Sequence, residues 1–297
     1  MSGPVLVTGA GGFVGRHLLA ELGGRAVAGR ADVTDGDALA AELREVAPAA
    51  VCHLAAATSV AESWRRGAET WRVNVLGTVA LLDAVCAEAP EARTLVVSTG
   101  EVYGPTPDGP AGEDTPVAPL SPYAASKAAA ELAATRAARA EKLDVVVARP
   151  FQHAGPGQDE RFAIGSWTAR IARLERAGGG ELEVGDLTVR RDLTDVRDVT
   201  RAYRLLLDPA TPAGTYNVCS GRTVELTTVL DTLVRLAREP VEVRDNPALR
   251  RPVDVPVLVG DPARLEAATG WRAEIPLEQT LADALDEARR RAAEEDA

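Results

Sequence analysis

Short apolar runs alternate with longer amphipathic stretches through the first half of the chain. The apolar runs predict β-strands at residues 5–7, 26–28, 50–53, 94–98 and 145–149. The stretches between them predict helices at residues 12–21, 37–46, 71–88 and 122–142. Such an alternation predicts an α/β fold with a doubly wound parallel sheet, because parallel strands need helical crossovers on both faces.

The rhythm of short strands and helices changes after residue 149. Gly155, Pro156 and Gly157 predict a loop. Helices are then expected at residues 162–177, 198–207 and 224–239, and strands at residues 192–196 and 215–218. A proline-rich stretch and two further helices complete the chain, and the sequence contains no internal repeat or low-complexity linker.

A glycine-rich turn joins the first predicted strand to the first helix. Gly9 allows a tight turn, Gly12 lets the backbone approach a pyrophosphate at the helix N-terminus, and Gly15 permits close helix–strand packing. The spacing is Gly-x-x-Gly-x-x-Gly, which differs from the standard Gly-x-Gly-x-x-Gly fingerprint. Taken alone, the motif is also compatible with a plain strand-to-helix turn.

Tyr123 and Lys127 lie four residues apart and therefore on one face of a predicted helix. A neighbouring ammonium is expected to lower the pKa of the tyrosine from about 10. Such a tyrosine can transfer a proton near neutral pH. Many surface helices carry this spacing by chance, and the pair gains weight here from the glycine-rich turn.

Together these motifs resemble the extended short-chain dehydrogenase/reductase superfamily over nearly the whole chain. Residues 8–15 match its cofactor motif, residues 53–56 match the end of its fourth strand, and Tyr123 and Lys127 match its catalytic pair. The resemblance implies a Rossmann-type sheet that binds NADP or NAD. It also implies a smaller C-terminal α/β domain that binds a nucleotide-linked sugar.

The resemblance further implies two domains interleaved in sequence. The dinucleotide-binding domain comprises residues 1–152 plus about 193–219. The nucleotide-sugar-binding domain comprises about 153–192 plus 220–297. The cleft between them is the expected site.

The resemblance also assigns roles to individual residues. The catalytic residues are Thr99, Glu101, Tyr123 and Lys127. The cofactor contacts are Gly9, Gly11, Gly12, Phe13, Val14, Gly15, Arg30, Asp32, Val33, Leu54, Ala55, Ala56, Asn74, Ser98, Tyr123, Lys127, Pro150 and His153. The substrate contacts are Ser59, Glu101, Gln152, Arg161, Arg191, Arg251 and Asp254. No metal is expected, because the three histidines are far apart and show no ligand spacing.

Several segments in the second half of the chain resemble a signature of enzymes that act on GDP-mannose-type substrates. The matching segments are residues 185–198, 216–221, 251–256, 269–271 and 275–278. They most resemble GDP-4-dehydro-6-deoxy-mannose reductases, which make GDP-rhamnose, with GDP-mannose 4,6-dehydratases and other nucleotide-sugar epimerases as close alternatives. This similarity implies that Arg191 contacts the diphosphate, where a guanidinium can bind bidentately. An ion pair with Asp192 or Asp195 is the alternative, and Arg161, Arg251 and Asp254 are equally compatible with surface positions.

Residues 99–101 bear on the choice between reductase and dehydratase. A dehydratase needs an acid and a base besides the tyrosine. At these three positions, dTDP-sugar dehydratases carry a sequence like Thr-Asp-Glu, and GDP-mannose dehydratases carry one like Thr-Ser-Glu. This chain has Gly100 at the middle position. The missing side chain favours a 4-keto reductase in which Tyr123 donates the proton and Thr99 orients the ketone. Glu101 could serve a dehydratase, so that function stays an alternative, or it could only bind sugar hydroxyls. A non-catalytic sensor on the same fold is a more distant alternative.

The segment after the second strand is unusually short. A third strand is therefore expected to be vestigial or fused with the second. Arg30 occupies the position of the acid that binds an NAD ribose, and a guanidinium there suits the 2′-phosphate of NADP. A solvated turn residue is the alternative for Arg30, and Asp32 is expected at the adenine. Gln152 replaces the asparagine that relatives usually carry, which affects one sugar contact.

Composition narrows the expected partners and compartment. The 297 residues carry a net charge of −11, which argues against nucleic acid and anionic membranes as partners. No apolar run is expected to reach the roughly 20 residues of a membrane span, and no signal peptide is expected. Cys52, Cys86 and Cys219 predict buried free thiols in a reducing compartment, so a cytoplasmic location is expected. Relatives commonly form homodimers through two helices, here residues 71–88 and 122–142.

Overall fold

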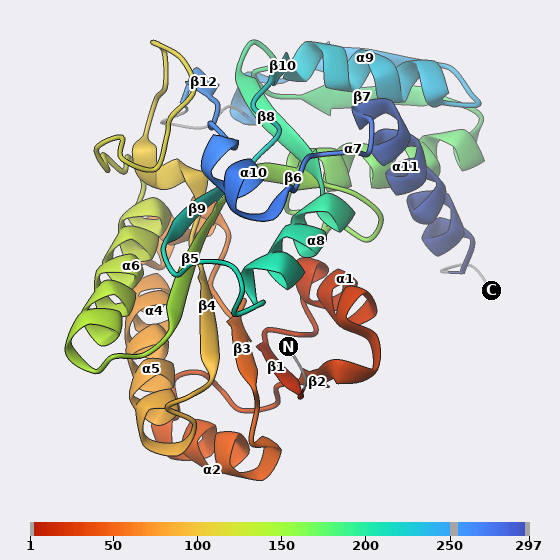
Figure 1. Ribbon diagram of the computed structural model, residues 1–297. Helices are drawn as coiled ribbons and strands as arrows, with labels where there is room; N and C mark the ends of the chain where they lie inside the picture. Colours follow the sequence, from red (N-terminus) through yellow and green to blue (C-terminus); the bar gives the residue numbers. More distant parts are fainter. Residues whose placement is uncertain (1–2, 250–254, 295–297) are drawn as a thin grey trace.

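The computed structural model describes residues 3–249 and 255–294 (Figure 1). A six-stranded sheet has the order β2–β1–β3–β4–β5–β9, and all neighbouring strands in it are parallel. Its strands are β1 (Val5–Thr8), β2 (Ala26–Ala28), β3 (Ala50–His53), β4 (Arg93–Val97), β5 (Val145–Pro150) and β9 (Thr215–Val218). β1, β3, β4 and β5 are buried along their whole length, which is why they appear in the sequence as continuous apolar runs.

Helices cover both faces of this sheet, as predicted. On one face α1 (Phe13–Leu22) packs against α8 (Val196–Leu206), around a core that includes Val7, Leu18 and Tyr203. On the other face α2 (Gly36–Val46), α5 (Gly77–Glu88) and α6 (Pro122–Ala140) share a core that includes Leu6, Leu39 and Leu81. The doubly wound Rossmann-type fold is therefore confirmed.

The chain passes from β2 to α2 without a further strand, so the expected loss of a third strand is confirmed. The buried carboxylate of Glu42 on α2 accepts hydrogen bonds from the backbone N–H groups of Arg30 (2.7 Å) and Ala31 (3.2 Å). Asp35 then caps α2 by accepting from the Ala38 N–H. These bonds hold the shortened connection in place of a strand.

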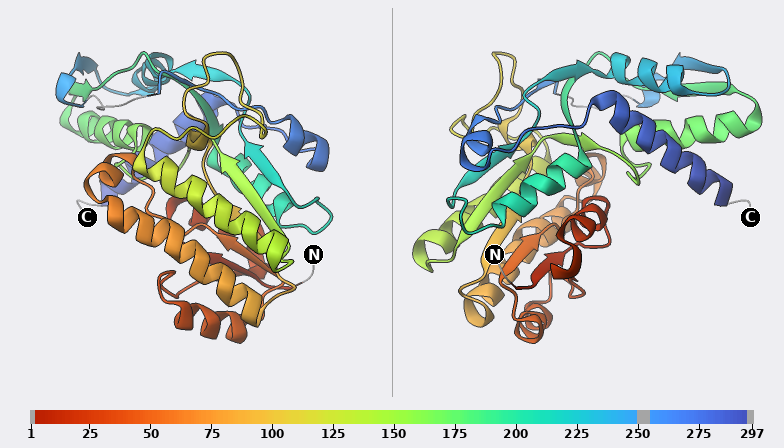
Figure 2. Two further views of the ribbon diagram at one scale, coloured as in Figure 1. Left: turned by 90° about the vertical axis from the view of Figure 1, so that its left-hand side faces the viewer. Right: turned by 45° about the vertical axis from the view of Figure 1, so that its right-hand side comes forward.

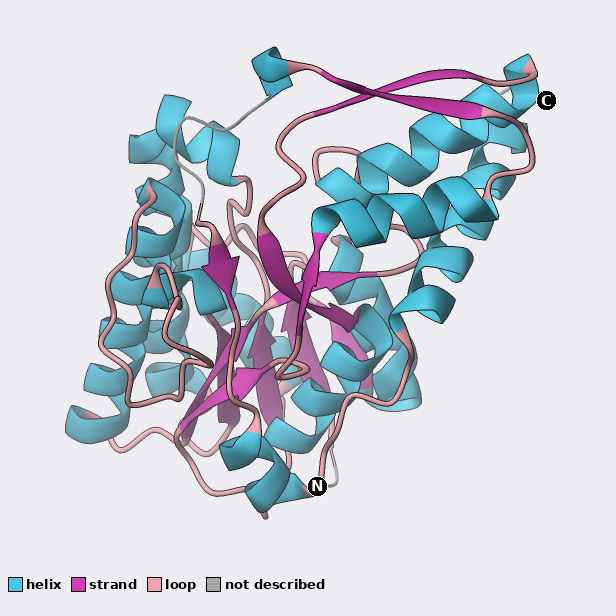
Figure 3. Ribbon diagram, turned by 90° about the horizontal axis from the view of Figure 1, so that it is seen from above, coloured by secondary structure: helices cyan, strands magenta, loops and turns pink. Residues whose placement is uncertain are grey.

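A second group of elements lies over the end of the sheet at which β5 leads into β6 (Figures 1 and 2). β8 (Arg190–Asp195) pairs with β6 (Gln152–Ala154), β10 (Thr223–Glu225) and β12 (Val257–Leu258). The helices α7 (Ala163–Ala177), α9 (Leu226–Leu236) and α11 (Leu277–Glu294) share a separate apolar core. β7 (Gly180–Val184) and β11 (Val241–Asp245) form a two-stranded parallel ribbon at its outer edge (Figure 3). The strands β6, β7, β10, β11 and β12 were not predicted.

The predicted helix at residues 71–88 begins earlier and changes geometry along its length. α4 (Gly67–Trp71) continues through a π-helical turn (Arg72–Leu76) into α5. The whole run, Gly67–Glu88, is 22 residues long and apolar enough to cross a membrane by length and composition alone, so the expectation that no such run exists was wrong. It packs against α2 and α6, and 44% of its apolar 18-residue window is buried. Two short helices, α3 (Val60–Arg65) and α10 (Ala263–Thr269), complete the α-helices of the described residues.

All three cysteines are free thiols, as expected. Cys52 and Cys219 are buried, but Cys86 is only partly buried, so the prediction of full burial is wrong at that position. Cys86 lies near the end of α5, where the helix leaves the core. Burial raises the pKa of the Cys52 thiol, which makes it unreactive near neutral pH.

Candidate functional site

The glycine-rich turn depends on two glycines that admit no side chain. Gly9 has φ +68°, and a Cβ there would lie 2.7 Å from the Ala55 nitrogen. A Cβ at Gly15 would lie 2.5 Å from the carbonyl oxygens of both Gly9 and Ala10. The tight turn at Gly9 and the close packing at Gly15 therefore agree with the sequence interpretation. At Gly12 the N–H donates to the Gly9 carbonyl (3.0 Å), and its approach to a pyrophosphate remains a prediction.

A buried polar chain supports this turn from below. The Thr8 hydroxyl lies 2.8 Å from Nδ1 of His53 and accepts a hydrogen bond from the Ala55 N–H. Nε2 of His53 lies 3.1 Å from the Thr78 hydroxyl. Burial, together with the nearby Lys127 ammonium, lowers the pKa of His53 to about 3, so the ring is neutral at pH 7. His53 thus ties β1, β3 and α5 together, a role that the sequence motif did not reveal.

Asn74 lies in the π-helical turn and is almost fully buried. Its side chain accepts from the Ala57 N–H (2.8 Å) and donates to the Ala57 carbonyl (3.1 Å) and the Ser126 hydroxyl (2.9 Å). These bonds join the loop after β3 to α6. π-Helical turns are frequent at functional sites, and the predicted contact of Asn74 with the cofactor stays a prediction.

Tyr123 and Lys127 lie in the first two turns of α6, where Ser121 caps the helix and Pro122 follows the cap. Both side chains are buried, with 9% and 5% exposed. The side chain of Thr99, which directly follows β4, lies close enough to the Tyr123 hydroxyl to lower its pKa. The structure therefore brings together three of the four predicted catalytic residues, and Glu101 is close enough to act on Tyr123 through its charge.

The pKa of Tyr123 differs from the expectation. Burial raises it above its usual value, the Glu101 carboxylate raises it further, and the Thr99 hydrogen bond opposes them. The predicted lowering of the Tyr123 pKa is therefore wrong, because loss of solvent around the buried phenol is the largest effect on it. A tyrosine that keeps its proton at pH 7 is suited to donate it, as a reduction requires.

The buried ammonium of Lys127 gives a measurable pH dependence of stability. Burial lowers the pKa of Lys127 from 10.5 to about 8, against the opposing effect of the Glu131 carboxylate. Between these two pH values the unfolded chain binds more protons than the folded one, so the free energy of unfolding rises with pH. Relative to Lys127→Met, the wild-type protein should gain about 3 kcal/mol between pH 7 and pH 10.5. Urea unfolding of both proteins measures this difference, and parallel pH profiles would contradict the buried charge.

Behind Lys127, a buried ion pair continues the network. Arg149, at the end of β5, donates to Glu131 from Nη2 (2.6 Å) and from Nε (2.9 Å). It also donates to the Tyr103 hydroxyl (2.8 Å), which in turn donates to Asn217. Sequence reasoning missed this network, although Glu131 lies four residues after Lys127 on the same helix face.

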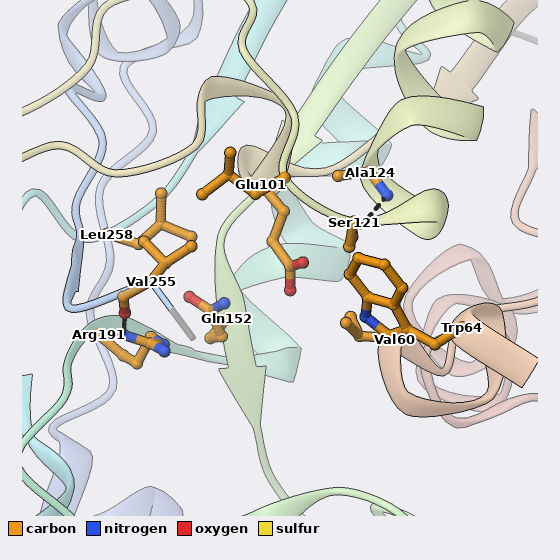
Figure 4. Close-up of a pocket in the computed structure, with 10 residues that line it drawn as sticks. Val60, Trp64, Glu101, Ser121, Ala124, Gln152, Arg191, Val255 and Leu258 are labelled. Carbon is orange, nitrogen blue, oxygen red and sulfur yellow. Dashed lines mark hydrogen bonds between the residues drawn. The ribbon is translucent and has the colours of Figure 1, made fainter. Parts of the chain in front are cut away.

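A cavity opens beside Glu101 and the first turn of α6, the turn that carries Tyr123 (Figure 4). Its lining combines polar and apolar side chains from both groups of elements: Val60, Trp64, Glu101, Leu120, Ser121, Ala124, Gln152, Arg191, Val255 and Leu258. Oε1 of Gln152 is buried and has no hydrogen-bond partner in the described part of the chain. Arg191 donates to the Val255 carbonyl (2.6 Å), while Asp192 and Asp195 accept bonds from Ser220 and Arg197 instead. Three predicted substrate residues, Glu101, Gln152 and Arg191, therefore share this cavity.

The remaining predicted cofactor residues follow the ends of neighbouring strands. Phe13 and Val14 begin α1, and the Phe13 ring stacks on His153 at 6.0 Å between centroids. The others at this edge are Gly11, Leu54, Ala55, Ala56, Ser98 and Pro150. Ligands of open α/β sheets bind at this edge, and the predicted roles of these residues are compatible with their positions.

Other predicted residues lie elsewhere or carry structural contacts. Arg161 pairs with Asp159 (2.9 Å) and does not line the cavity, so the structure does not bring it to the other substrate residues. Ser59 caps α3 by accepting from the Glu62 N–H. Arg251 and Asp254 lie outside the described residues.

Near the adenine side, three further predicted residues have partners of their own. Arg30 is 71% exposed and pairs with Glu45 (3.1 Å). Asp32 accepts from the backbone and side chain of Thr34, and these bonds lower the pKa of its carboxyl. Val33 is buried.

Comparison with known proteins supports this reading of the fold. The model of the family described as GDP-mannose 4,6 dehydratase matches residues 20–284. A GDP-6-deoxy-D-mannose reductase from Pseudomonas aeruginosa is 38% identical over 99% of this chain and 100% of its own length. The solved structure of RMD from Pseudomonas aeruginosa complexed with NADPH has a TM-score of 0.90 at 37% identity, over 98% of this chain and 100% of that one. A Thermus thermophilus UDP-glucose 4-epimerase complexed with NAD has a TM-score of 0.86 at 30% identity, over 96% and 99%.

Proposed function

Because the chain belongs to the family described as GDP-mannose 4,6 dehydratase, we propose that it is an NADPH-dependent reductase of the 4-keto group of a GDP-linked 6-deoxy sugar. The observation that carries this choice within the family is the packing around Gly100. A Cβ at Gly100 would lie 2.8 Å from three ring atoms of Phe151, whose side chain is buried. The site therefore has no room at position 100 for the aspartate or serine side chain that is typical of the two kinds of dehydratase.

The residues at the sheet edge fit a dinucleotide. α1 begins without a capping side chain and without an acidic residue in its first turn, which leaves N–H groups for a phosphate. The hydroxyl of Ser98, directly after β4, is buried without a partner in the described residues. Gly9, Gly12, Ser98 and Lys127 would hold the cofactor. The hydride for C4 of the sugar is supplied by the reduced dinucleotide when it is bound.

The chain's own residues supply the proton and orient the ketone. Tyr123 keeps its proton at neutral pH and donates it to the oxygen that gains charge at C4. Thr99, whose side chain lies near the Tyr123 hydroxyl, would hydrogen-bond the same ketone oxygen and orient it. Arg191 brings a buried guanidinium to the cavity for the diphosphate, and Glu101 accepts from sugar hydroxyls.

A direct assay separates the reductase from the alternatives. We expect NADPH absorbance to fall when the protein is mixed with GDP-4-keto-6-deoxy-mannose, and to stay constant with GDP-mannose alone. Water loss from GDP-mannose without net cofactor consumption would instead establish a dehydratase, which the retained Glu101 favours as the second candidate. Binding of NADPH without turnover of either sugar would point to a sensor.

We expect Arg30 to favour NADPH over NADH. Its exposed pairing with Glu45 contributes little to stability, and its contact with Glu42 is long (3.7 Å), so the guanidinium can turn to a 2′-phosphate. Arg30→Ala should raise the Kd for NADPH by about 10-fold, the value expected when one charge-assisted hydrogen bond is lost. The Kd for NADH should not change. Fluorescence titration measures both constants, and Arg44→Ala on the neighbouring helix is the matched control.

The same chain is also proposed to form a homodimer through α5 and α6. Leu132 on α6 is 73% exposed, and Leu76, directly before α5, is 61% exposed. Leu132→Glu should shift the mass measured by light scattering from dimer to monomer. Leu249→Glu, at an exposed leucine elsewhere, should leave the mass unchanged. A wild-type monomer would contradict the proposal.

A further inference from the structure

One wall of the cavity is apolar and takes no part in the proposed proton transfer. It is formed by Val60 and Trp64, which lie one helical turn apart on α3. The Trp64 side chain is 51% exposed, although a tryptophan usually buries most of its large apolar surface. An exposed aromatic ring inside a concave site is typical of a ligand contact.

This wall is held in a fixed position relative to the proton donor. Ser63, between the two wall residues, is only 1% exposed. Its hydroxyl accepts a hydrogen bond from the backbone N–H of Tyr123 (3.2 Å) and donates one to the Val60 carbonyl (2.7 Å). α3 is therefore tied directly to the residue that reacts with the C4 oxygen.

The other side of the cavity carries two polar side chains, beside the apolar Val255 and Leu258. Figure 4 shows Gln152 and Arg191 on one side of the Glu101 carboxylate and Val60 and Trp64 on the other. Oε1 of Gln152 is a buried acceptor without a partner in the described residues, and it would gain a bond from a sugar hydroxyl. In a 4-keto-6-deoxy sugar, the carbonyl carbon lies between C3, which carries a hydroxyl, and C5, which carries the methyl group. The hydroxyl at C3 suits the buried acceptor of Gln152, and the methyl group at C5 suits the apolar wall of Val60 and Trp64.

We propose that Val60 and Trp64 form the subsite for the C6 methyl group and thereby select 6-deoxy sugars over sugars with a C6 hydroxyl. The inference rests on the proposed function. An apolar contact weakens the binding of a sugar with an added hydroxyl by at most about 100-fold, because the only cost is the hydration that the hydroxyl loses. We therefore expect the protein to bind the deoxy sugar about 10- to 100-fold more tightly.

GDP-6-deoxy-mannose and GDP-mannose test this subsite, because they differ only in the C6 hydroxyl. Neither sugar reacts with NADPH, so calorimetry on the NADPH-loaded protein gives both Kd values. Val60→Thr keeps the shape of the side chain and adds a hydroxyl, and it should reduce the preference to less than about 3-fold. Trp64→Ala should do the same by weakening the binding of the deoxy sugar. Trp64→Phe should retain most of the preference.

Val117→Thr makes the same exchange at an exposed valine outside the lining and should leave both Kd values unchanged. An unaltered preference in Val60→Thr and Trp64→Ala would overturn the subsite, even if the wild-type protein consumes NADPH with the keto sugar. Absence of NADPH consumption, with the preference and its loss as expected, would overturn only the proposed reductase. Failure of the wild-type protein to bind either sugar would overturn both.

Discussion

Tyr123→Phe should lower kcat for the keto sugar by about 1,000-fold and leave the Kd for NADPH within about 3-fold of wild type. Proton donation by a positioned side chain contributes typically 100- to 10,000-fold to a rate. Phenylalanine removes only the hydroxyl, so the buried ring still packs at the start of α6. Stopped-flow measurement of NADPH oxidation and equilibrium titration of NADPH give the two quantities.

A second tyrosine provides the matched control for this substitution. The Tyr216 hydroxyl donates to the Pro212 carbonyl from β9, and Tyr216 is not among the residues that line the cavity. Tyr216→Phe should therefore lower the free energy of unfolding by about 1 kcal/mol without changing kcat. The kcat of Thr99→Ala should lie between those of the two tyrosine variants, since it removes the hydroxyl that orients the ketone but leaves the Tyr123 proton in place. Near-normal turnover by Tyr123→Phe would remove Tyr123 from the mechanism.

The elements predicted from sequence were those with a strong and local apolar signal. β1, β3, β4 and β5 are buried on both faces, and most of their residues are accordingly apolar. β7 and β11 form a mostly exposed ribbon with charged residues in both strands, so their sequence carries no such signal. Pairing between distant segments, rather than local preference, makes these residues strands.

In the candidate site, too, some features follow from local sequence and others depend on contacts between distant segments. The turn at Gly9 and the pairing of Thr99 with Tyr123 follow from short motifs. Three features depend on parts of the chain that only the fold brings together. They are the Phe151 ring that fills the space beside Gly100, the burial that raises the Tyr123 pKa, and the wall at Trp64. The sequence therefore indicated the chemistry, and the fold indicates which reaction of the family it favours.

Gly15→Ala should destabilise the protein by about 3 kcal/mol or more, at the upper end of the range for overpacking. The new methyl group would lie 2.5 Å from two backbone carbonyl oxygens, those of Gly9 and Ala10. Neither oxygen can move without opening the turn, because the Gly9 carbonyl accepts from the Gly12 N–H. Relief of the clash would push α1 away from β1 and disturb the packing of Leu18 in the core. The Kd for NADPH should rise as well.

Gly11→Ala is the control for this prediction, because it makes the same chemical change in the same turn. A Cβ at Gly11 meets no atom within 4 Å, and its φ is not positive. The free energy of unfolding should therefore stay the same or rise by up to about 1 kcal/mol, since alanine restricts the unfolded chain. Urea unfolding of the cofactor-free proteins measures both effects. Equal stabilities of the two variants would show that Gly15 is dispensable for close packing and that the turn tolerates a side chain there.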